Sequence, residues 1–350
     1  MNQFVFPVGV FVAVAVLIPV LIRLAPVLKL VDLPDERKQH EGAVPLIGGL
    51  AIFPVFIMGA IFTGHGVVGY WPLYAAILLL LVTGAIDDKF HIRPWIKFMM
   101  QFIAAALVVF AGGAELSHLG DIFGMGVLEL GFMSGFFSWI AVVLLINAVN
   151  LMDGLDGLAG GYSAVALGWI WFGFYSVGQS DGLLLLLIAG IGGFLVYNLR
   201  SPIRAKAALF LGDAGSMCLG LCLGWFAIGL GKVGGADVPA IAIAWVLAIP
   251  IMDTCAQFYR RAREGRHPFS PDRGHFHHHF IDAGFRDGVA VFLILSLAVI
   301  LGAFGVVGVQ LGVPQIVLSS IWIVMILAHM WVSEKPHRYV SFWGKFAPKS

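Results

Sequence analysis

Charged side chains are scarce in this chain of 350 residues, of which Asp, Glu, Lys and Arg make up only 12%. Soluble domains carry about twice that share, so the composition excludes an ordinary soluble globular protein. The 21 basic and 20 acidic residues nearly cancel, which leaves no excess of positive charge for binding nucleic acid. Hydrophobic residues instead reach 60%, with a mean hydropathy of +0.94, and they predict an integral-membrane protein.

Cysteine is also rare: only Cys218, Cys222 and Cys255 occur, all within apolar runs. Their spacing matches neither a disulfide framework nor a set of metal ligands. We therefore expect them to be small buried hydrophobic side chains.

Apolar stretches close to the ~20 residues that cross a hydrocarbon core recur along the whole chain. They predict an all-α polytopic membrane protein with about eleven transmembrane helices in one integral-membrane domain, residues 1–350. The expected spans are residues 3–22, 45–63, 71–87, 95–111, 135–152, 159–177, 182–199, 208–230, 238–259, 289–311 and 314–332. Residues 112–134, where glycines separate short apolar runs, are expected to form a small hairpin on the outer face.

Lys and Arg are distributed very unevenly among the connecting loops. Twenty of the 21 lie in alternate loops, around residues 23–44, 89–97, 200–206, 260–286 and after 333, and only Lys232 lies in the others. Because basic residues stay on the cytoplasmic side, the first set of loops is predicted to be cytoplasmic. With eleven spans the N-terminus is expected outside and the C-terminus in the cytoplasm, whereas ten spans would break this asymmetry.

The segment "NAVNLMDGLDGLAGG", residues 147–161, ends an almost wholly apolar stretch. Asn147, Asn150 and Asp153 recur every three residues and therefore share one helical face at the predicted cytoplasmic end. Asp156 follows in a glycine-rich turn, which allows the backbone to approach a ligand closely. A helix C-cap would explain one Asn and one Gly, but carboxylates are unfavourable at the negative end of a helix dipole, so a functional site is favoured.

The segment "GAIDDKFHIRP", residues 84–94, places adjacent carboxylates, Asp87 and Asp88, at the inner end of the third span. Adjacent carboxylates beside low-dielectric lipid repel each other and are stable chiefly when a cation lies near them. A divalent metal would supply that charge. Ion pairs to Lys89 and Arg93, both within a turn, are the alternative.

The segment "FLGDAGSMCLG", residues 210–220, puts Asp213 just inside the eighth span, where a carboxylate is unfavourable and indicates function. The nearest base along this part of the sequence is Lys206. Mg²⁺, which takes one or two carboxylates together with substrate phosphates, would account for Asp213. A hydrogen-bonded packing carboxylate, which is our interpretation of Asp253 in "IPIMDT", is the alternative.

The loop of residues 260–288 carries an arginine and four histidines within seven positions: Arg273, His275, His277, His278 and His279. Zinc is disfavoured, because no cysteine accompanies the histidines and their spacing cannot direct all four rings to one tetrahedral centre. Arg offers a planar fork to phosphate, and His can donate a hydrogen bond near neutral pH. Binding of an anionic substrate is therefore favoured over a merely solvated basic loop.

The segment "VDLPDERKQHEGAVPLIGG", residues 31–49, leads into the second span and carries Arg37, Lys38 and His40. Arg37 and His40 are candidates for binding an anionic group. General attraction of basic residues to anionic lipid head groups is the alternative.

These groups combine carboxylates that suit Mg²⁺ with bases that suit phosphate, at the depth of the lipid head groups. Phosphoryl transfer fits the carboxylates, the bases and their position in the membrane. Its transition state spreads negative charge over oxygens that metal and cationic groups stabilise. A lipid phosphate would already be largely ionised near neutral pH, so a strong general base is optional. An ion-coupled secondary transporter is the alternative from another class, but the acidic groups lie near one face and no inverted repeat is visible.

Five segments in this order resemble the signatures of the polyprenyl-phosphate N-acetylhexosamine-1-phosphate transferases, most closely their WecA/TagO branch. They are "DLPDERKQHEGAVPLIGG", "DDKFHIRP", "NAVNLMDGLDGLAGG", "FLGDAGS" and "PDRGHFHHH", and the resemblance covers about residues 30–350. It implies a catalytic membrane domain in the inner (plasma) membrane with its site facing the cytoplasm. The reaction implied is transfer of N-acetylglucosamine 1-phosphate, or a related amido-sugar 1-phosphate, from a UDP-sugar to undecaprenyl phosphate, which releases UMP and requires Mg²⁺, with Mn²⁺ as a conceivable substitute.

The resemblance also implies roles for individual residues. The catalytic residues implied are Asp87, Asp88, Asp153 and Asp156, and the metal-site residues are Asp87, Asp88 and Asp213. The substrate-binding residues implied are Arg37, His40, Asn147, Asn150, Arg273, His275, His277 and His278. Met152 departs from the family's pattern, which leads us to expect Ile or Thr, but it is apolar and leaves the motif intact.

The same mechanism with another donor, UDP-N-acetylfucosamine or UDP-N-acetylquinovosamine, is a nearer alternative. A few side chains could set that difference, so the sequence does not name the sugar. The resemblance places the reaction at the first membrane step of cell-envelope polysaccharide synthesis, as in O-antigen and lipopolysaccharide formation. A homodimer is compatible with the sequence.

Overall fold

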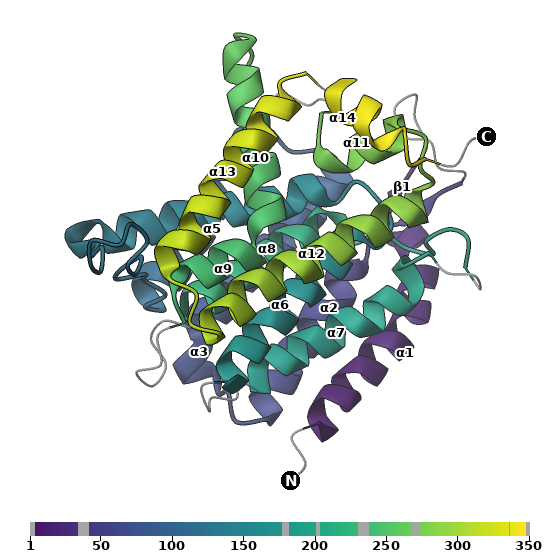
Figure 1. Ribbon diagram of the computed structural model, residues 1–350. Helices are drawn as coiled ribbons and strands as arrows, with labels where there is room; N and C mark the ends of the chain where they lie inside the picture. The colour runs from purple at the N-terminus through teal and green to yellow at the C-terminus, as the bar shows by residue number, and fades with distance from the viewer. Residues whose placement is uncertain are drawn as a thin grey trace.

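The computed structural model describes residues 4–33, 42–176, 182–200, 204–229, 238–267, 274–335 and 337–347, and these are mostly helical, as predicted (Figure 1). The longer helices are α1 (Val5–Leu28), α2 (Gly48–Phe62), α3 (Val67–Phe90), α4 (Pro94–Ala106), α5 (Ser134–Met152), α6 (Leu158–Ser176), α7 (Gly182–Asn198), α8 (Gly212–Gly229), α10 (Ala248–Arg263), α12 (Asp287–Gln310) and α13 (Gln315–Ser333). The short elements are β1 (Val31–Asp32), β2 (Val44–Pro45), η1 (Leu107–Ala111), η2 (Gly131–Met133), α9 (Ala240–Val246), α11 (Phe276–Asp282) and α14 (His337–Trp343).

Ten of the eleven predicted spans have a single helical counterpart whose ends lie within six residues of the expected ones. Among the described residues, seven helical segments are long and apolar enough to cross a membrane, and the bent pair α9–α10 would make eight. α2 and α7 are apolar but shorter, with 15 and 17 residues. The chain is therefore an all-α polytopic membrane protein, while eleven spans and the orientation of the termini stay predictions.

The ninth expected span, residues 238–259, is not one continuous helix, so that part of the prediction is wrong. The chain bends by 77° between α9 and α10, and Leu247 is the residue between them. Pro250 lies in the first turn of α10, where its missing N–H leaves no helical hydrogen bond unmade. The two helices therefore run in different directions.

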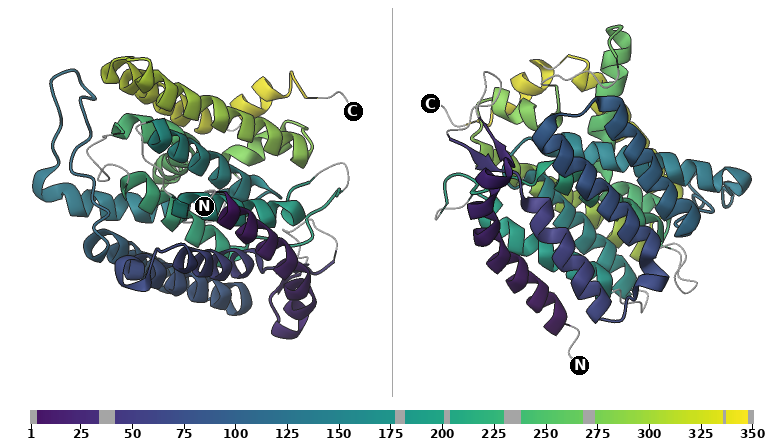
Figure 2. Two further views of the ribbon diagram at one scale, coloured as in Figure 1. Left: turned by 90° about the horizontal axis from the view of Figure 1, so that it is seen from below. Right: turned by 180° about the vertical axis from the view of Figure 1, so that it is seen from behind.

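Helix α8 forms the centre of the bundle. Of its span, 83% lies buried, against 22% for α1 and for α13. The left view of Figure 2 shows α12 and α13 on one side of the molecule and α3 on the other, with the middle helices between them. A buried helix surrounded on all sides can be apolar all round, whereas α1 and α13 present much of their apolar surface outward to lipid.

α3 packs on α8 at very close range because of one glycine. A side chain added at Gly84 of α3 would overlap the backbone of Asp213 and Ala214, in the first turn of α8. Small residues permit such close contact between membrane helices. This contact brings the last turn of α3, with Asp87 and Asp88, against the start of α8.

The two short strands between α1 and α2 connect the same end of the bundle to the residues just before α8. β1 pairs with β2 in antiparallel register, Val31 opposite Pro45, and Leu46 bridges Phe210 just before α8. Figure 1 shows β1, α11 and α14 at this end and the start of α1 at the opposite end. The polar motifs therefore gather at one end of the bundle, near the C-terminal helix.

The expected hairpin within residues 112–134 is present. His118 forms an antiparallel bridge with Glu129, and the N–H of Leu119 donates to the carbonyl of Leu128 at 2.9 Å. Asp121 closes its tip, since Oδ1 accepts a hydrogen bond from the N–H of Gly126 at 2.9 Å. The side of the membrane on which the hairpin lies stays a prediction.

Candidate active site

Asp88 and Asp213 meet where α3 ends and α8 begins. Asp88 Oδ1 accepts a hydrogen bond from the backbone N–H of Asp213 at 3.0 Å, and Asp88 Oδ2 lies 3.5 Å from the N–H of Ala214. The first N–H groups of a helix have no partner inside that helix. Asp88 therefore caps α8 from a neighbouring helix and fixes the position of Asp213.

Lys97 of α4 bridges the other pair of carboxylates. Its Nζ lies 3.0 Å from Asp87 Oδ2 and also contacts Asp213 Oδ2. Asp87 Oδ1 in turn accepts a hydrogen bond from the N–H of Ile92 at 2.9 Å, in the connection from α3 to α4. Three spans thus contribute to one charged cluster, and its lysine was not among the sequence candidates.

Lys89 and Arg93 were the partners considered for Asp87 and Asp88 from the sequence. Within the part of the chain that the structure describes, neither forms an ion pair with these carboxylates. The ammonium of Lys89 lies over the ring of Phe90 instead, 5.3 Å from its centroid. The local ion-pair interpretation is therefore wrong, and the compensating charge comes from the next helix.

Asn150 joins the cluster from α5. Its Nδ2 donates hydrogen bonds to Asp213 Oδ1 at 2.8 Å and to Ser216 Oγ at 2.9 Å. Asn147, one turn earlier, does not reach the cluster, because its Nδ2 donates to Gln101 Oε1 of α4 at 2.7 Å. Asn150 thus lies in the carboxylate cluster, while Asn147 ties two helices together, and the substrate-binding roles of both stay predictions.

Asp153 follows α5 directly, and its contacts differ from those of the other carboxylates. Its side chain makes no hydrogen bond or ion pair with any other described residue. Burial, followed by the nearby carboxylates of Asp213, Asp88 and Asp156, raises the pKa of Asp153 to about 8. Added positive charge would favour its ionised form.

Asp156 has a partner of its own. Arg200 Nε lies 2.7 Å from its Oδ2, and the same guanidinium reaches Asp287 at the start of α12, also at 2.7 Å. The N–H of Ala207 donates to Asp156 at 3.3 Å. Asp156 therefore anchors the loop after α5, and its predicted catalytic role stays a prediction.

His277 brings the histidine loop to the loop after α5. A side chain added at Gly154 would overlap His277 Nε2, so only glycine permits this approach. The atom Nε2 is buried and has no hydrogen-bond partner among the described residues. Burial, then the neighbouring ring of His278, lowers the pKa of His277 to about 3, so the ring is neutral near pH 7.

The other histidines have separate surroundings. His275 Nδ1 bonds Asp253 Oδ2 at 2.9 Å, while the ring of His278 lies 4.2 Å from that of His277. His279 is buried and stacks on Tyr339 of α14, with ring centroids 4.8 Å apart. Among the described histidines, no three lie together with the geometry of a metal centre.

Three predicted substrate-binding residues, Arg37, His40 and Arg273, lie outside the described residues. Their roles stay predictions.

The donors of the carboxylate cluster suit magnesium. Asp87 and Asp213, from different spans, already share one cationic group, the Lys97 ammonium, so the space between them accommodates positive charge. Within the described ranges no three His, Cys, Asp or Glu side chains converge as a complete metal centre. A metal here would have two carboxylates from the protein and take its remaining ligands from water and substrate phosphates, as Mg²⁺ usually does.

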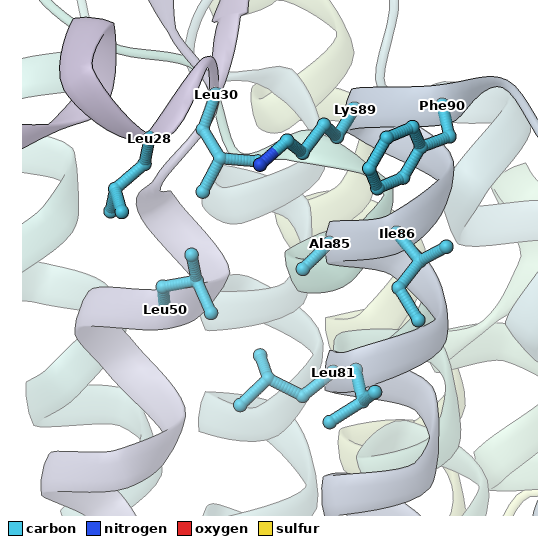
Figure 3. A pocket seen from close by; sticks show the side chains of 9 residues that line it. Leu28, Leu30, Leu50, Leu81, Ala85, Ile86, Lys89 and Phe90 are labelled. Atoms are coloured by element: carbon cyan, nitrogen blue, oxygen red, sulfur yellow. The ribbon is translucent and has the colours of Figure 1, made fainter.

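An apolar pocket of about 360 Å³ lies between the end of α1, α2 and α3 (Figure 3). Figure 3 shows Leu28, Leu50, Leu81 and Ile86 along it, with the amine of Lys89 reaching across one end. A pocket of this lining suits a hydrocarbon chain better than a polar ligand.

Comparison with known proteins finds relatives that match most of the chain. Residues 70–231 match the family model described as Glycosyl transferase family 4. The chain is 33% identical over 320 residues to the undecaprenyl-phosphate α-N-acetylglucosaminyl 1-phosphate transferase of Yersinia pestis, covering 91% of this chain and 87% of that protein. It is 35% identical to the enzymes of the same name from Escherichia coli K12, covering 81% and 78%, and from Haemophilus influenzae, covering 88% and 86%.

The matched region carries the carboxylates of α3, the loop after α5 and the start of α8. Identity of about a third over most of both lengths establishes common descent and a common class of chemistry. The chain therefore belongs to the family of undecaprenyl-phosphate N-acetylglucosaminyl 1-phosphate transferases and is a membrane glycosyl 1-phosphate transferase.

Proposed function

We propose that this enzyme transfers N-acetylglucosamine 1-phosphate from UDP-N-acetylglucosamine to undecaprenyl phosphate, with Mg²⁺ as cofactor. The observation that carries the proposal is the meeting of Asp87 and Asp213, from separate spans, on one cationic group. The loop that bears Asp153, with His277 against it, lies beside them. The names of the relatives supply the lipid and the sugar.

The reaction needs one bond made and one bond broken. An oxygen of the lipid phosphate attacks the phosphorus that carries the sugar, and the bond from that phosphorus to the bridging oxygen of the diphosphate breaks. UMP leaves with the electron pair, and the sugar stays on the new lipid-linked diphosphate. The lipid phosphate is already ionised near neutral pH, so the chain mainly has to bind, orient and neutralise charge.

Asp87 and Asp213 would hold the magnesium ion, which neutralises developing charge on the phosphate oxygens. Asp88 holds the start of α8 through its backbone N–H groups and thereby aims Asp213. Asn150 fixes the second oxygen of Asp213 from α5. Lys97 supplies the positive charge of the cluster and would remain as a neighbour of the reacting phosphates.

The histidine side would receive the diphosphate of the donor. His277 Nε2 is buried without a hydrogen-bond partner in the part of the chain that the structure describes, and it lies against the loop of Asp153, where a ligand could complete its hydrogen bonding. The ring is neutral near pH 7, so one of its nitrogens can donate without bringing a net charge into a buried place. Arg273, His275 and His278 are proposed to complete this side.

The site is proposed to face the cytoplasm in the inner (plasma) membrane, where the donor nucleotide is made. The positions of Lys and Arg support this, since twenty of the 21 fall in the loops of that side. The product would begin cell-envelope polysaccharide synthesis.

The test is to supply the purified protein with undecaprenyl phosphate, Mg²⁺ and each of several UDP-sugars, and to measure UMP. We expect release with UDP-N-acetylglucosamine and its loss in excess EDTA. Faster release with UDP-N-acetylfucosamine or UDP-N-acetylquinovosamine would change the donor but keep the reaction. No UMP with any donor would refute the proposal, while family membership already favours an enzyme over the transporter alternative.

A further inference from the structure

One face of α10 carries a polar stripe that the carboxylate cluster does not use. Asp253, Gln257 and Arg260 are spaced by four and three residues, so they lie one above another on the same side of the helix. All three are buried, with Gln257 fully so and the other two 6% exposed. Polar side chains this deeply buried require partners.

The partners of the stripe are the residues that begin the histidine helix α11. Asp253 Oδ2 bonds His275 Nδ1 at 2.9 Å, and Asp253 Oδ1 accepts the N–H of Phe276, also at 2.9 Å. Gln257 Nε2 donates to the carbonyl of Gly274, and Arg260 donates to Gln257 Oε1 at 2.6 Å. The stripe therefore holds three consecutive residues, 274 to 276, from one side.

The bond to Asp253 decides what His275 can offer. A carboxylate only accepts hydrogen bonds, so Nδ1 must carry the proton in the bond between them. Nε2 is then the nitrogen left for another partner, in a ring that is only 5% exposed. The carboxylate thus sets both the orientation and the tautomer of the imidazole.

The effect extends from His275 to the site. The rings of His275 and His277 lie parallel, 7° apart in plane and 6.0 Å between centroids. His277 Nε2 in turn lies against Gly154, beside Asp153. The path from the stripe to the site therefore runs through two stacked imidazoles.

We propose that Asp253 is a positioning residue of this enzyme: it orients His275, and through it His277, toward the diphosphate of the nucleotide-sugar donor. The inference rests on the proposed function for the identity of that ligand, but the Asp253–His275 bond itself does not. The proposal gives Asp253 a role in positioning, whereas its sequence context indicated only packing. Asp253 touches no reacting atom in this assignment and acts through the histidines.

The alternative is that Asp253 only fastens α11, because it also accepts the N–H of Phe276. The substitution Asp253→Asn separates the two tasks with little change in volume. The new amide oxygen can still accept the Phe276 N–H, but its NH₂ group then faces His275 Nδ1. That nitrogen must become an acceptor, and the proton moves to Nε2.

The experiment combines Asp253→Asn, His275→Gln and the double variant, with Asp121→Asn as the matched control. Asp121 also accepts a backbone N–H through one oxygen, at 2.9 Å, but in the distant hairpin. We expect each single variant to raise the KM for the UDP-sugar about tenfold to a hundredfold, with the KM for undecaprenyl phosphate unchanged. The double variant should be no worse than the poorer single one, because both remove the same interaction.

The tautomer is measured separately from turnover. In ¹⁵N-histidine-labelled protein, the ring signal that disappears in His275→Gln should show a protonated Nδ1, and in Asp253→Asn it should shift to a protonated Nε2. Independent effects that multiply in the double variant, equal changes in both KM values, or a wild-type ring protonated at Nε2 would each overturn the assignment. A wild-type protein with the expected tautomer but no UMP release would refute the proposed function and leave the dyad standing.

Discussion

The two polar clusters at the site differ in what they lack: the first lacks compensating charge, and the second lacks hydrogen-bond partners. In the carboxylate cluster, Asp87, Asp88 and Asp213 all accept hydrogen bonds, but three negative groups share a single described lysine, Lys97. In the histidine cluster, the rings of His277 and His279 are neutral near pH 7, but His277 Nε2 and both ring nitrogens of His279 have no hydrogen-bond partner among the described residues. One cluster needs positive charge, and the other needs hydrogen-bonding atoms.

The difference between the clusters fits a ligand with two ends. A magnesium ion would supply charge to the carboxylates, and diphosphate oxygens would supply acceptors to the neutral histidine side. Neither cluster would bind such a ligand well alone, because the first would repel the anion and the second would leave the metal without ligands. The close packing of His277 on the loop of Asp153 joins the two halves.

The largest expected effect comes from the carboxylate side. Asp213→Asn keeps the shape and the hydrogen bond from Asn150 but removes the charge shared by Lys97. We expect kcat/KM to fall by about a hundredfold or more, since a lost metal ligand removes several kcal/mol, roughly, of transition-state stabilisation. UMP release at saturating Mg²⁺ measures this effect.

Asp121→Asn is the control for Asp213→Asn, since it neutralises a carboxylate in the hairpin and should leave activity unchanged. Wild-type turnover by Asp213→Asn in excess EDTA would show that the cluster holds no catalytic metal.

A smaller and more specific effect is expected from Lys97→Gln. Without the ammonium, Asp87 and Asp213 face each other uncompensated, and we expect a loss of about 1–3 kcal/mol in stability. Millimolar Mg²⁺ should restore much of this loss in the variant and change the wild type less, because a cation would take the place of the lysine. Thermal unfolding in detergent with and without Mg²⁺ measures the difference.

Equal stabilisation of the wild type and of Lys97→Gln by Mg²⁺ would place the metal elsewhere. Ca²⁺ and K⁺ at matched ionic strength control for general screening of the carboxylates.

The carboxylates were singled out from the sequence, and their lysine was missed. Asp87, Asp88 and Asp213 stand out because ionisable groups at the ends of apolar spans are rare. Lys97 lies 116 residues before Asp213, and nothing local pairs the two. The same rule applied to every span would have singled out Lys97, the one base inside the fourth apolar stretch.

Asp253 was interpreted as a hydrogen-bonded packing carboxylate, and its bonds to His275 and Phe276 agree with that interpretation, but the positioning role proposed above was not foreseen. A carboxylate within "IPIMDT" has no charged neighbour in sequence, and only its spacing to Gln257 and Arg260 shows a polar face. The spans themselves were predictable because hydropathy is a local property. The 77° bend between α9 and α10 was not, because the residue at the break is a leucine and the proline comes three residues later.

The contact between the clusters can be tested by adding one methyl group. Gly154→Ala places a Cβ where His277 Nε2 lies, so the two loops must separate. We expect activity to fall about tenfold, with the stability of the bundle nearly unchanged. Gly168→Ala is the matched control, because a Cβ at Gly168 of α6 meets nothing within 4 Å, and Ala favours the helix. Full activity of Gly154→Ala would mean that His277 does not act at this loop.

The smallest expected effect is on the stability of the histidine cluster in acid. Burial lowers the pKa of His279 to about 4, below the ordinary value of about 6.5 that it has when unfolded. Between these values the unfolded chain binds a proton that the folded chain does not, so the contribution of His279 to stability is complete above about pH 6.5 and is lost as the pH falls. The expected loss at about pH 5 is about 2 kcal/mol.

His279→Asn should lower the Tm at neutral pH, because it removes the stack on Tyr339, yet flatten the fall of Tm on acidification. The exposed His337, substituted in the same way, should do neither, and an unchanged acid slope in His279→Asn would show that this ring is not held neutral.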